Sequence, residues 1–165
     1  MNRILLFISI LTALSSTAFA HSSAMKPEFV DTLLAPYFEI QMGLANDKWE
    51  IAKPAAAKFQ NALKQGPSAE EAPEMKAFTQ IAKTLNEAKD IEKAREAFHS
   101  LSKEMITLVD HVGAASTTAY QMHCTMGFGY TGASWLQAND KLINPYWGAR
   151  MLRCGHEEAI YAPKK

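Results

Sequence analysis

Residues 90–113 read DIEKAREAFHSLSKEMITLVDHVG, and this stretch decides the fold class. Its apolar residues recur at steps of three and four, which is the period of an amphipathic helix. They are Ile91, Ala94, Phe98, Leu101, Met105, Leu108 and Val112. Asp90 is suited to cap the start of this helix, and Gly113 is suited to end it. We therefore predict one long helix that buries one face.

The residues before this stretch show the same period in three further segments. Pro27 suits the opening turn of the first, and Pro54 is expected in the first turn or at a kink of the second. Ser68 and Glu71 form the pattern of a capping box before the third. Four helices with short links predict an antiparallel four-helix bundle over residues 27–112. The apolar positions are Phe29, Leu33, Tyr37, Ile40 and Leu44, then Ala55, Phe59 and Leu63, then Phe78, Ile81 and Leu85.

After Gly113 the composition changes to glycine, aromatic and turn-forming residues. We expect residues 113–165 to form a small irregular or β C-terminal cap on the helices. Residues 117–126 and 149–154 are expected to be short extended segments, which would become neighbours if they pair. Irregular segments on a rigid scaffold are common places for binding sites. The aromatic residues expected to anchor the cap are Trp135, Tyr146 and Trp147.

The first twenty residues have the pattern of a secretory signal peptide. Arg3 supplies the positive end, an apolar run follows over residues 4–14, and Ala18-Phe19-Ala20 matches the cleavage pattern. The run is shorter than the ~20 apolar residues that a membrane-spanning helix needs. We therefore expect a mature chain of residues 21–165. It would be a single soluble domain exported into a bacterial periplasm.

The charges of the chain are balanced, with 17 Lys plus Arg against 17 Asp plus Glu. Removal of the signal peptide takes away only Arg3 from this total. Mixed, near-neutral charge gives no electrostatic case for binding nucleic acid or an anionic membrane. The domain is long enough to bury a core without disulfides, although an exported location permits one.

Two short clusters in the expected cap carry the residues with the most specific chemistry. They are Met122-His123-Cys124-Thr125-Met126 and Met151-Leu152-Arg153-Cys154-Gly155-His156. Both cysteines of the chain lie in them. Sulfur ligands beside imidazoles suit Cu(I) better than Mg²⁺ or Ca²⁺, which prefer oxygen. The candidate metal ligands are Cys124, Met126, Cys154, Met151, His156 and His123.

Each candidate ligand also has a structural explanation. Cys124 and Cys154 could form a disulfide that joins the two segments of the cap, instead of a thiolate pair on a metal. A methionine is often a core gap-filler, and Met122 in particular is expected in the core. His123 would point away from Cys124 if their segment is a strand. His21 could chelate Cu(II) at the mature N-terminus, but no facing imidazole is indicated.

The clusters also belong to a wider pattern. Together with Gly132-Ala133-Ser134-Trp135-Leu136 and Asn144-Pro145-Tyr146-Trp147-Gly148, they resemble a domain of unknown function. That family is found fused to, or encoded beside, periplasmic adaptors of copper and silver efflux systems. The resemblance implies a helical bundle with a C-terminal cap that binds heavy metals in the periplasm. Thr125 stands where the family usually has proline, so the turn that presents Met126 is expected to be looser.

The function that these observations favour is not enzymatic. We expect a periplasmic protein that binds Cu(I), or Ag(I), as a metal sponge or as a chaperone for an efflux adaptor. The competing interpretation is a secreted helical interaction module, stapled by a Cys124–Cys154 disulfide and without metal. Hydrolytic, phosphate-binding and paired-carboxylate motifs are absent from the sequence, as is the Cys-x-x-Cys motif of thiol–disulfide enzymes.

Overall fold

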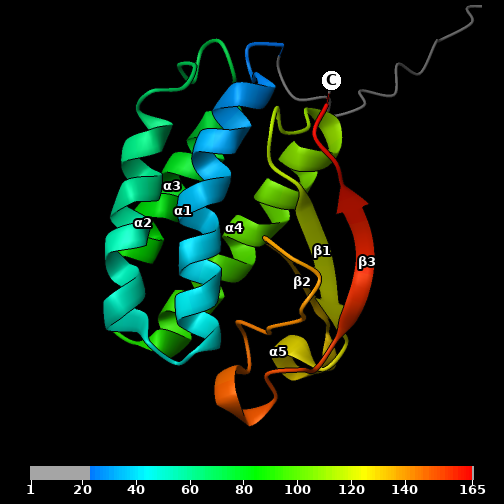
Figure 1. Ribbon diagram of the computed structural model, residues 1–165. Helices are drawn as coiled ribbons and strands as arrows, with labels where there is room; N and C mark the ends of the chain where they lie inside the picture. The colour runs from blue at the N-terminus through cyan, green and yellow to red at the C-terminus, as the bar shows by residue number, and fades with distance from the viewer. Residues whose placement is uncertain (1–22, 165) are drawn as a thin grey trace, which may run out of the picture.

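The computed structural model describes residues 23–164. The signal peptide predicted over residues 1–20, and His21, lie outside this part of the chain. Four long helices come first and a small sheet follows, as Figure 1 shows. The helices are α1 (Pro27–Ala45), α2 (Trp49–Leu63), α3 (Met75–Asn86) and α4 (Ile91–His111). They are followed by β1 (Ala119–Cys124), α5 (Gly127–Tyr130), β2 (Ala133–Gln137), the 3₁₀ helix η1 (Gly148–Arg150) and β3 (His156–Tyr161).

The signals at the two ends of α4 act as predicted. The Asp90 carboxylate accepts a hydrogen bond of 2.8 Å from the Lys93 N–H, which satisfies one open donor of the first turn. Beyond the other end, Gly113 adopts a φ of +80°, a conformation that glycine enters without a steric penalty. Pro27 also stands in the first turn of α1, as predicted.

Two expectations about the earlier helices need correction. Ser68 and Glu71 do exchange the two hydrogen bonds of a capping box, at 2.9 and 3.3 Å. They form only an isolated turn, however, because α3 begins at Met75. Pro54 lies inside α2, five residues after Trp49, so the first-turn position expected for it is wrong, while a kink at Pro54 stays a prediction.

The three strands form one antiparallel sheet in the order β2-β1-β3. The expected extended segment at residues 117–126 is confirmed in β1, but the one at residues 149–154 is wrong. Those residues form the end of η1 and a turn, and the partner strand is β3. The Asp47 carboxylate accepts a hydrogen bond from the Ala149 N–H, so this backbone is held by α1–α2 and not by a strand.

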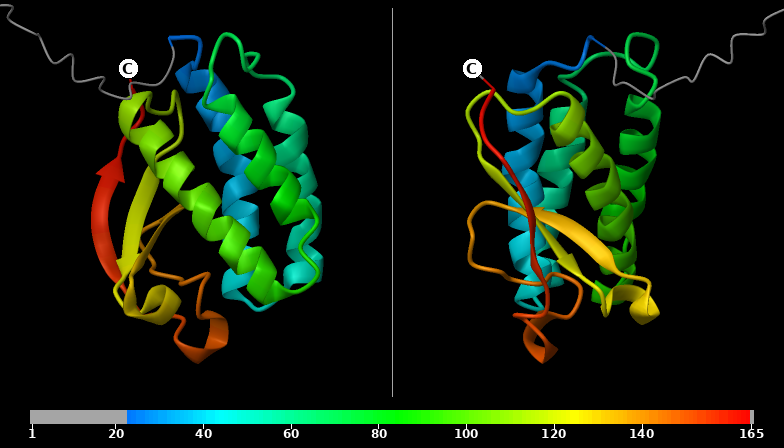
Figure 2. Two further views of the ribbon diagram at one scale, coloured as in Figure 1. Left: turned by 180° about the vertical axis from the view of Figure 1, so that it is seen from behind. Right: turned by 90° about the vertical axis from the view of Figure 1, so that its right-hand side faces the viewer.

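The sheet packs on α4, and a shared core lies between them, as the views in Figure 2 show. Trp135 of β2, Tyr37 of α1 and Phe98 of α4 are fully buried in this core. The Tyr37 hydroxyl accepts a hydrogen bond from the Leu136 N–H at 3.0 Å and so joins α1 to the sheet. The mainly helical fold with a small β cap is confirmed, while an antiparallel four-helix bundle stays a prediction.

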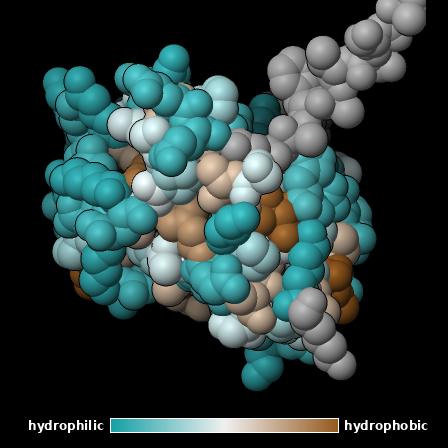
Figure 3. Space-filling model, turned by 90° about the horizontal axis from the view of Figure 1, so that it is seen from above, coloured by the Kyte–Doolittle hydropathy of each residue, from teal (hydrophilic) through white to brown (hydrophobic). Residues whose placement is uncertain are grey.

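The surface above the helix ends is mostly hydrophilic, with small apolar areas between polar side chains (Figure 3). Within residues 23–164, none of the helices combines the length and the hydrophobicity that crossing a bilayer requires.

Candidate functional site

The two cysteines meet at the end of the sheet that lies near α5. Cys124 is the last residue of β1, and Cys154 precedes β3. Their Sγ atoms are 2.8 Å apart, although the residues are separated by 30 positions. Cys124 is buried and Cys154 is half-buried. The predicted reason for this meeting was the pairing of residues 149–154 with β1, and that pairing does not occur.

Asn144 holds the segment that carries Cys154. Its side chain is fully buried, and its Nδ2 donates to the Cys154 carbonyl at 2.8 Å. Its Oδ1 accepts from the backbone N–H groups of Tyr146 at 2.8 Å and Trp147 at 3.2 Å. The Asn144 N–H also donates to the Leu152 carbonyl. One side chain therefore fixes both the Asn-Pro turn and the backbone beside the cysteine.

A buried arginine ties this turn to the helices. Arg95 of α4 is only 4% exposed. Its Nε donates to the Pro145 carbonyl at 2.8 Å, and its Nη2 donates to the Leu44 carbonyl at 3.0 Å. The same Nη2 lies 2.5 Å from Asp47 Oδ1. Arg95 and Asp47 thus join α1, α4 and η1.

The pKa of one thiol in the pair is shifted. The hydrogen bond with Cys124, and then burial, raise the pKa of Cys154 to about 11. Reactive and metal-binding cysteines act as thiolates, so the Cys154 thiol of the reduced protein stays protonated at neutral pH. A metal that binds here has to displace a proton.

The methionines of the two clusters lie at different depths. Met122 is buried in the core beside its cross-strand partner Trp135, which confirms the prediction for this residue. Met126 is the residue before α5, half-buried and packed against the core. Met151 directly follows η1, is half-buried, and its carbonyl accepts a hydrogen bond from the Cys154 N–H at 3.0 Å. Met126 and Met151 are thus within two or three residues of a cysteine along the chain.

The histidines of the clusters form a separate group. His123 precedes Cys124 in β1, so its side chain lies on the opposite face of the sheet. It is paired in register with His156 of β3, and the two ring centroids are 5.7 Å apart. The structure therefore brings the two cysteines together and the two histidines together, on different faces of β1.

The turn after Cys124 has an unusual backbone. Phe128 and Tyr130 have φ angles of +46° and +69°, which bulky side chains seldom adopt. The Phe128 ring packs on His99 with 4.4 Å between centroids. Burial, and then the charge of Lys103, lower the pKa of His99. Strained residues of this kind cluster at functional sites, and here they end β1 and change the chain direction beside Met126.

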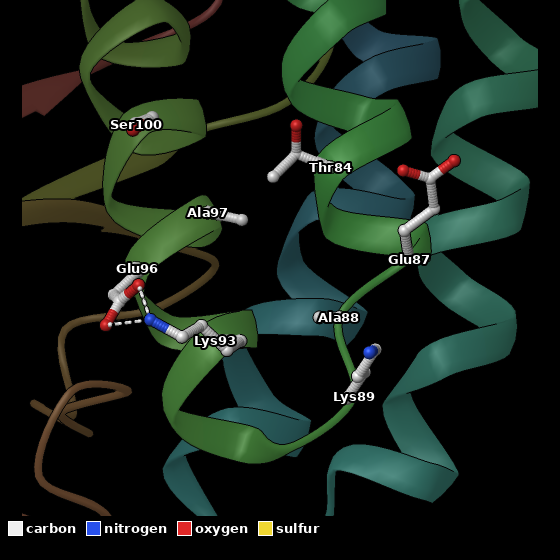
Figure 4. Close-up of a pocket in the computed structure, with 8 residues that line it drawn as sticks. All are labelled: Thr84, Glu87, Ala88, Lys89, Lys93, Glu96, Ala97 and Ser100. Carbon is white, nitrogen blue, oxygen red and sulfur yellow. Dashed lines mark hydrogen bonds and ion pairs between the residues drawn. The ribbon is translucent and has the colours of Figure 1, made fainter.

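A groove of about 520 Å³ between α3 and α4 is a separate feature of the surface (Figure 4). On the α4 side of the groove, Lys93 Nζ and Glu96 Oε2 form an ion pair at 2.7 Å. The side chains that line it in the described chain include no cysteine, methionine or histidine. Over residues 23–164, no group of three or more His, Cys, Asp or Glu side chains is arranged so that it could hold a metal ion.

The comparisons with known proteins place the chain in a family. Residues 33–117 match the model of the family described as "Protein of unknown function (DUF3347)", and this match covers more than half of the 165 residues. The chain belongs to the DUF3347 family. The match spans most of α1 through α4 and ends before β1, so the cysteine pair lies beyond it. Neither a curated protein nor a solved structure matches this DUF3347 chain.

Sequence reasoning missed the polar residues that position the site. Asn144 had a usable signal, because Asn before Pro is a turn former whose side chain bonds the following backbone. Arg95 had a weaker one, because it stands next to Ala94 on the apolar side of a strongly periodic helix. Asp47 had none that we can identify, since its partners Arg95 and Ala149 are far away in the sequence.

Proposed function

We propose that this DUF3347 protein binds a soft monovalent cation, Cu(I) or Ag(I), through Cys124 and Cys154. The observation that carries the proposal is the 2.8 Å separation of the two Sγ atoms. Thiolate sulfur is a ligand that selects Cu(I) over hard cations. Met126 and Met151 supply thioethers from the flanking residues. The four long helices, which we take to be an antiparallel bundle, are the scaffold that supports this end of the sheet.

The size of a metal ion fits the pair after a small movement. Metal–thiolate bonds of about 2.3 Å put two sulfurs that share an ion roughly 3.5–4.5 Å apart. The sulfurs therefore have to separate by about 1 Å, and a disulfide of about 2.05 Å requires them to approach by less than 1 Å. Because Cys154 is half-buried, it is the ligand through which an ion enters and leaves.

The role that suits such a site is storage and transfer, without catalysis. An ion held by two thiolates and nearby thioethers can pass stepwise to another protein by ligand exchange. In an exported protein, the receiver we propose is the periplasmic adaptor of a copper or silver efflux system. The compartment follows from the signal peptide predicted over residues 1–20.

Anaerobic Cu(I) titration against a calibrated chelator tests the proposal. We expect wild type to bind one Cu(I), Cys124→Ser to lose most of this affinity, and Met126→Leu to lose a smaller part. Met42→Leu is the matched control, because Met42 is an exposed methionine of α1. Equal affinity of wild type and Cys124→Ser would remove the proposed site. Transfer of Cu(I) from the loaded protein to a purified adaptor tests the proposed role.

A second function has one observation in its favour. The two sulfurs are closer than the van der Waals contact of unbonded sulfur atoms, so a disulfide needs only a short approach. The protein would then be a stapled interaction module without metal. Thiol titration before and after reduction separates the two functions. Cysteines that titrate as thiols only after reduction, and that Cu(I) then does not protect, would favour the staple.

A further inference from the structure

The outer face of the sheet carries a cluster of polar side chains that is separate from the cysteine pair. Its centre is the cross-strand pair of His123 and His156, whose rings are 5.7 Å apart between centroids and inclined by 60°. His156 is exposed, and the His123 side chain is 23% exposed. Figure 2 shows β3 and β1 on the side of the molecule away from the helices. Ions in solution can therefore reach both rings.

A chain of hydrogen bonds sets the tautomer of His123. Its Nδ1 lies 2.8 Å from Ser134 Oγ, and Ser134 Oγ donates its single hydrogen to Glu158 Oε2 at 3.2 Å. Ser134 Oγ therefore accepts from the His123 Nδ1–H. Gln121 Nε2 donates to the same Glu158 oxygen at 2.6 Å and holds that carboxylate in place. In the neutral ring, this arrangement leaves the lone pair of His123 Nε2 available.

The ring edge that carries this nitrogen lies close to Gly132, which has no side chain to cover it. A Cβ built on Gly132 would lie 3.0 Å from His123 Nε2 and 2.9 Å from Cε1. Gly132 has a φ of +84°, so a side chain is disfavoured there on two grounds. A side chain at position 132 would press against the ring edge that carries the available lone pair, and glycine avoids this contact.

We propose that His123 and His156 bind a late first-row divalent cation, with Zn²⁺ as the type case, at a site separate from the cysteine pair. Metal–nitrogen bonds of about 2.0–2.1 Å place two imidazoles that share an ion roughly 5–6 Å apart between centroids, which matches the pair. Imidazole suits such ions, and water completes the coordination at this exposed position. Ser134 and Glu158 are positioning residues, because ligating histidines commonly donate their other N–H to a carboxylate or an intervening group.

Zinc titration of a cysteine-free protein tests this site independently of Cu(I) binding. In Cys124→Ser/Cys154→Ser, we expect one Zn²⁺ to bind by calorimetry and His156→Gln to abolish that binding. His111→Gln is the matched control, since His111 is an exposed histidine on α4. Glu158→Gln is expected to weaken binding about 10-fold, as loss of an outer carboxylate does in other sites.

Imidazole ¹⁵N resonances of the wild-type protein give a second measurement that needs no cysteine variant. Zn²⁺ should shift the Nε2 resonance of His123 and a ring nitrogen of His156, and leave the resonances of His111 in place. Equal zinc affinity of His156→Gln and His111→Gln, or unshifted His123 and His156 resonances, would overturn the proposal. Neither result bears on the cysteine pair, so failure of this site and failure of Cu(I) binding are distinguishable.

Discussion

At the scale of single residues, Asn144 makes more side-chain hydrogen bonds within the cap than any of the candidate metal ligands. Asn144→Ala removes three side-chain hydrogen bonds and leaves buried backbone groups without partners. Unsatisfied buried groups cost about 1–3 kcal/mol each, so we expect the free energy of unfolding to fall by about 2–4 kcal/mol. Urea denaturation followed by circular dichroism measures this loss.

The matched control for this variant is Asn139→Ala. Asn139 is exposed, and its Oδ1 accepts one hydrogen bond, from the Lys141 N–H. We expect its replacement to change the free energy of unfolding by no more than about 0.5 kcal/mol. Similar losses in the two variants would mean that the cap does not depend on the position of Asn144.

The raised pKa of Cys154 predicts slow alkylation at neutral pH. The thiolate is the reacting form, so the rate in reduced protein should increase roughly tenfold per pH unit from pH 7 and level off only near pH 11. Mass spectrometry of the Cys154 peptide after timed iodoacetamide treatment measures the rate. A plateau at pH 8 to 9 would show that the thiol keeps an ordinary pKa.

At the scale of elements, the helices could be predicted and most strands could not. The period of α4 and its two end signals are local features, and both act as expected in the structure. β2 was missed because its short run Ala133–Gln137 follows a glycine-rich turn and pairs with β1 through long-range contacts. β3 was missed because its exposed Glu157 and Glu158 give no apolar alternation.

The Asp47–Arg95 contact joins elements, and it should make stability depend on pH. The hydrogen bond from the Ala149 N–H, and then Arg95, lower the pKa of Asp47 against the opposing effect of burial. A lowered pKa in the folded state stabilises the protein above the unfolded value of about 3.9, and this stabilisation is lost as pH falls towards the folded value. Asp47→Asn should therefore be less stable than wild type at pH 7.

The difference between Asp47→Asn and wild type should also shrink below about pH 4, where the wild-type carboxylate takes up its proton. Thermal unfolding of both proteins between pH 3 and pH 7 measures the change. Asp140→Asn serves as the control, because Asp140 is an exposed aspartate of the β2–η1 loop. We expect its difference in stability from wild type to stay the same across this pH range. A gap for Asp47→Asn that does not vary with pH would contradict the assigned role of its charge.

At the scale of the whole molecule, the residues of the two clusters could be recognised from the sequence. Their separation into a cysteine pair and a histidine pair could not. The two clusters were recognisable from residue types alone, and the two cysteines do meet. The split into a cysteine pair and a histidine pair follows from strand alternation in β1, which could be applied only once β3 was known to be the partner. Residues that hold the site in place, such as Arg95, contact backbone about fifty positions away in the sequence. Contacts of this range leave no local sequence pattern.

Closure of the pair by oxidation should stabilise the whole domain, because it links the end of β1 to the start of β3. A loop of 30 residues is worth about 3–4 kcal/mol in the chain-entropy description. We expect oxidised protein to exceed reduced protein in free energy of unfolding by about that amount. Cys124→Ser should show no dependence on redox state. Parallel urea titrations with and without reductant measure both proteins. An oxidised form no more stable than the reduced one would mean that bond formation strains the cap, and the pair would then be better suited to holding an ion than to stapling the fold.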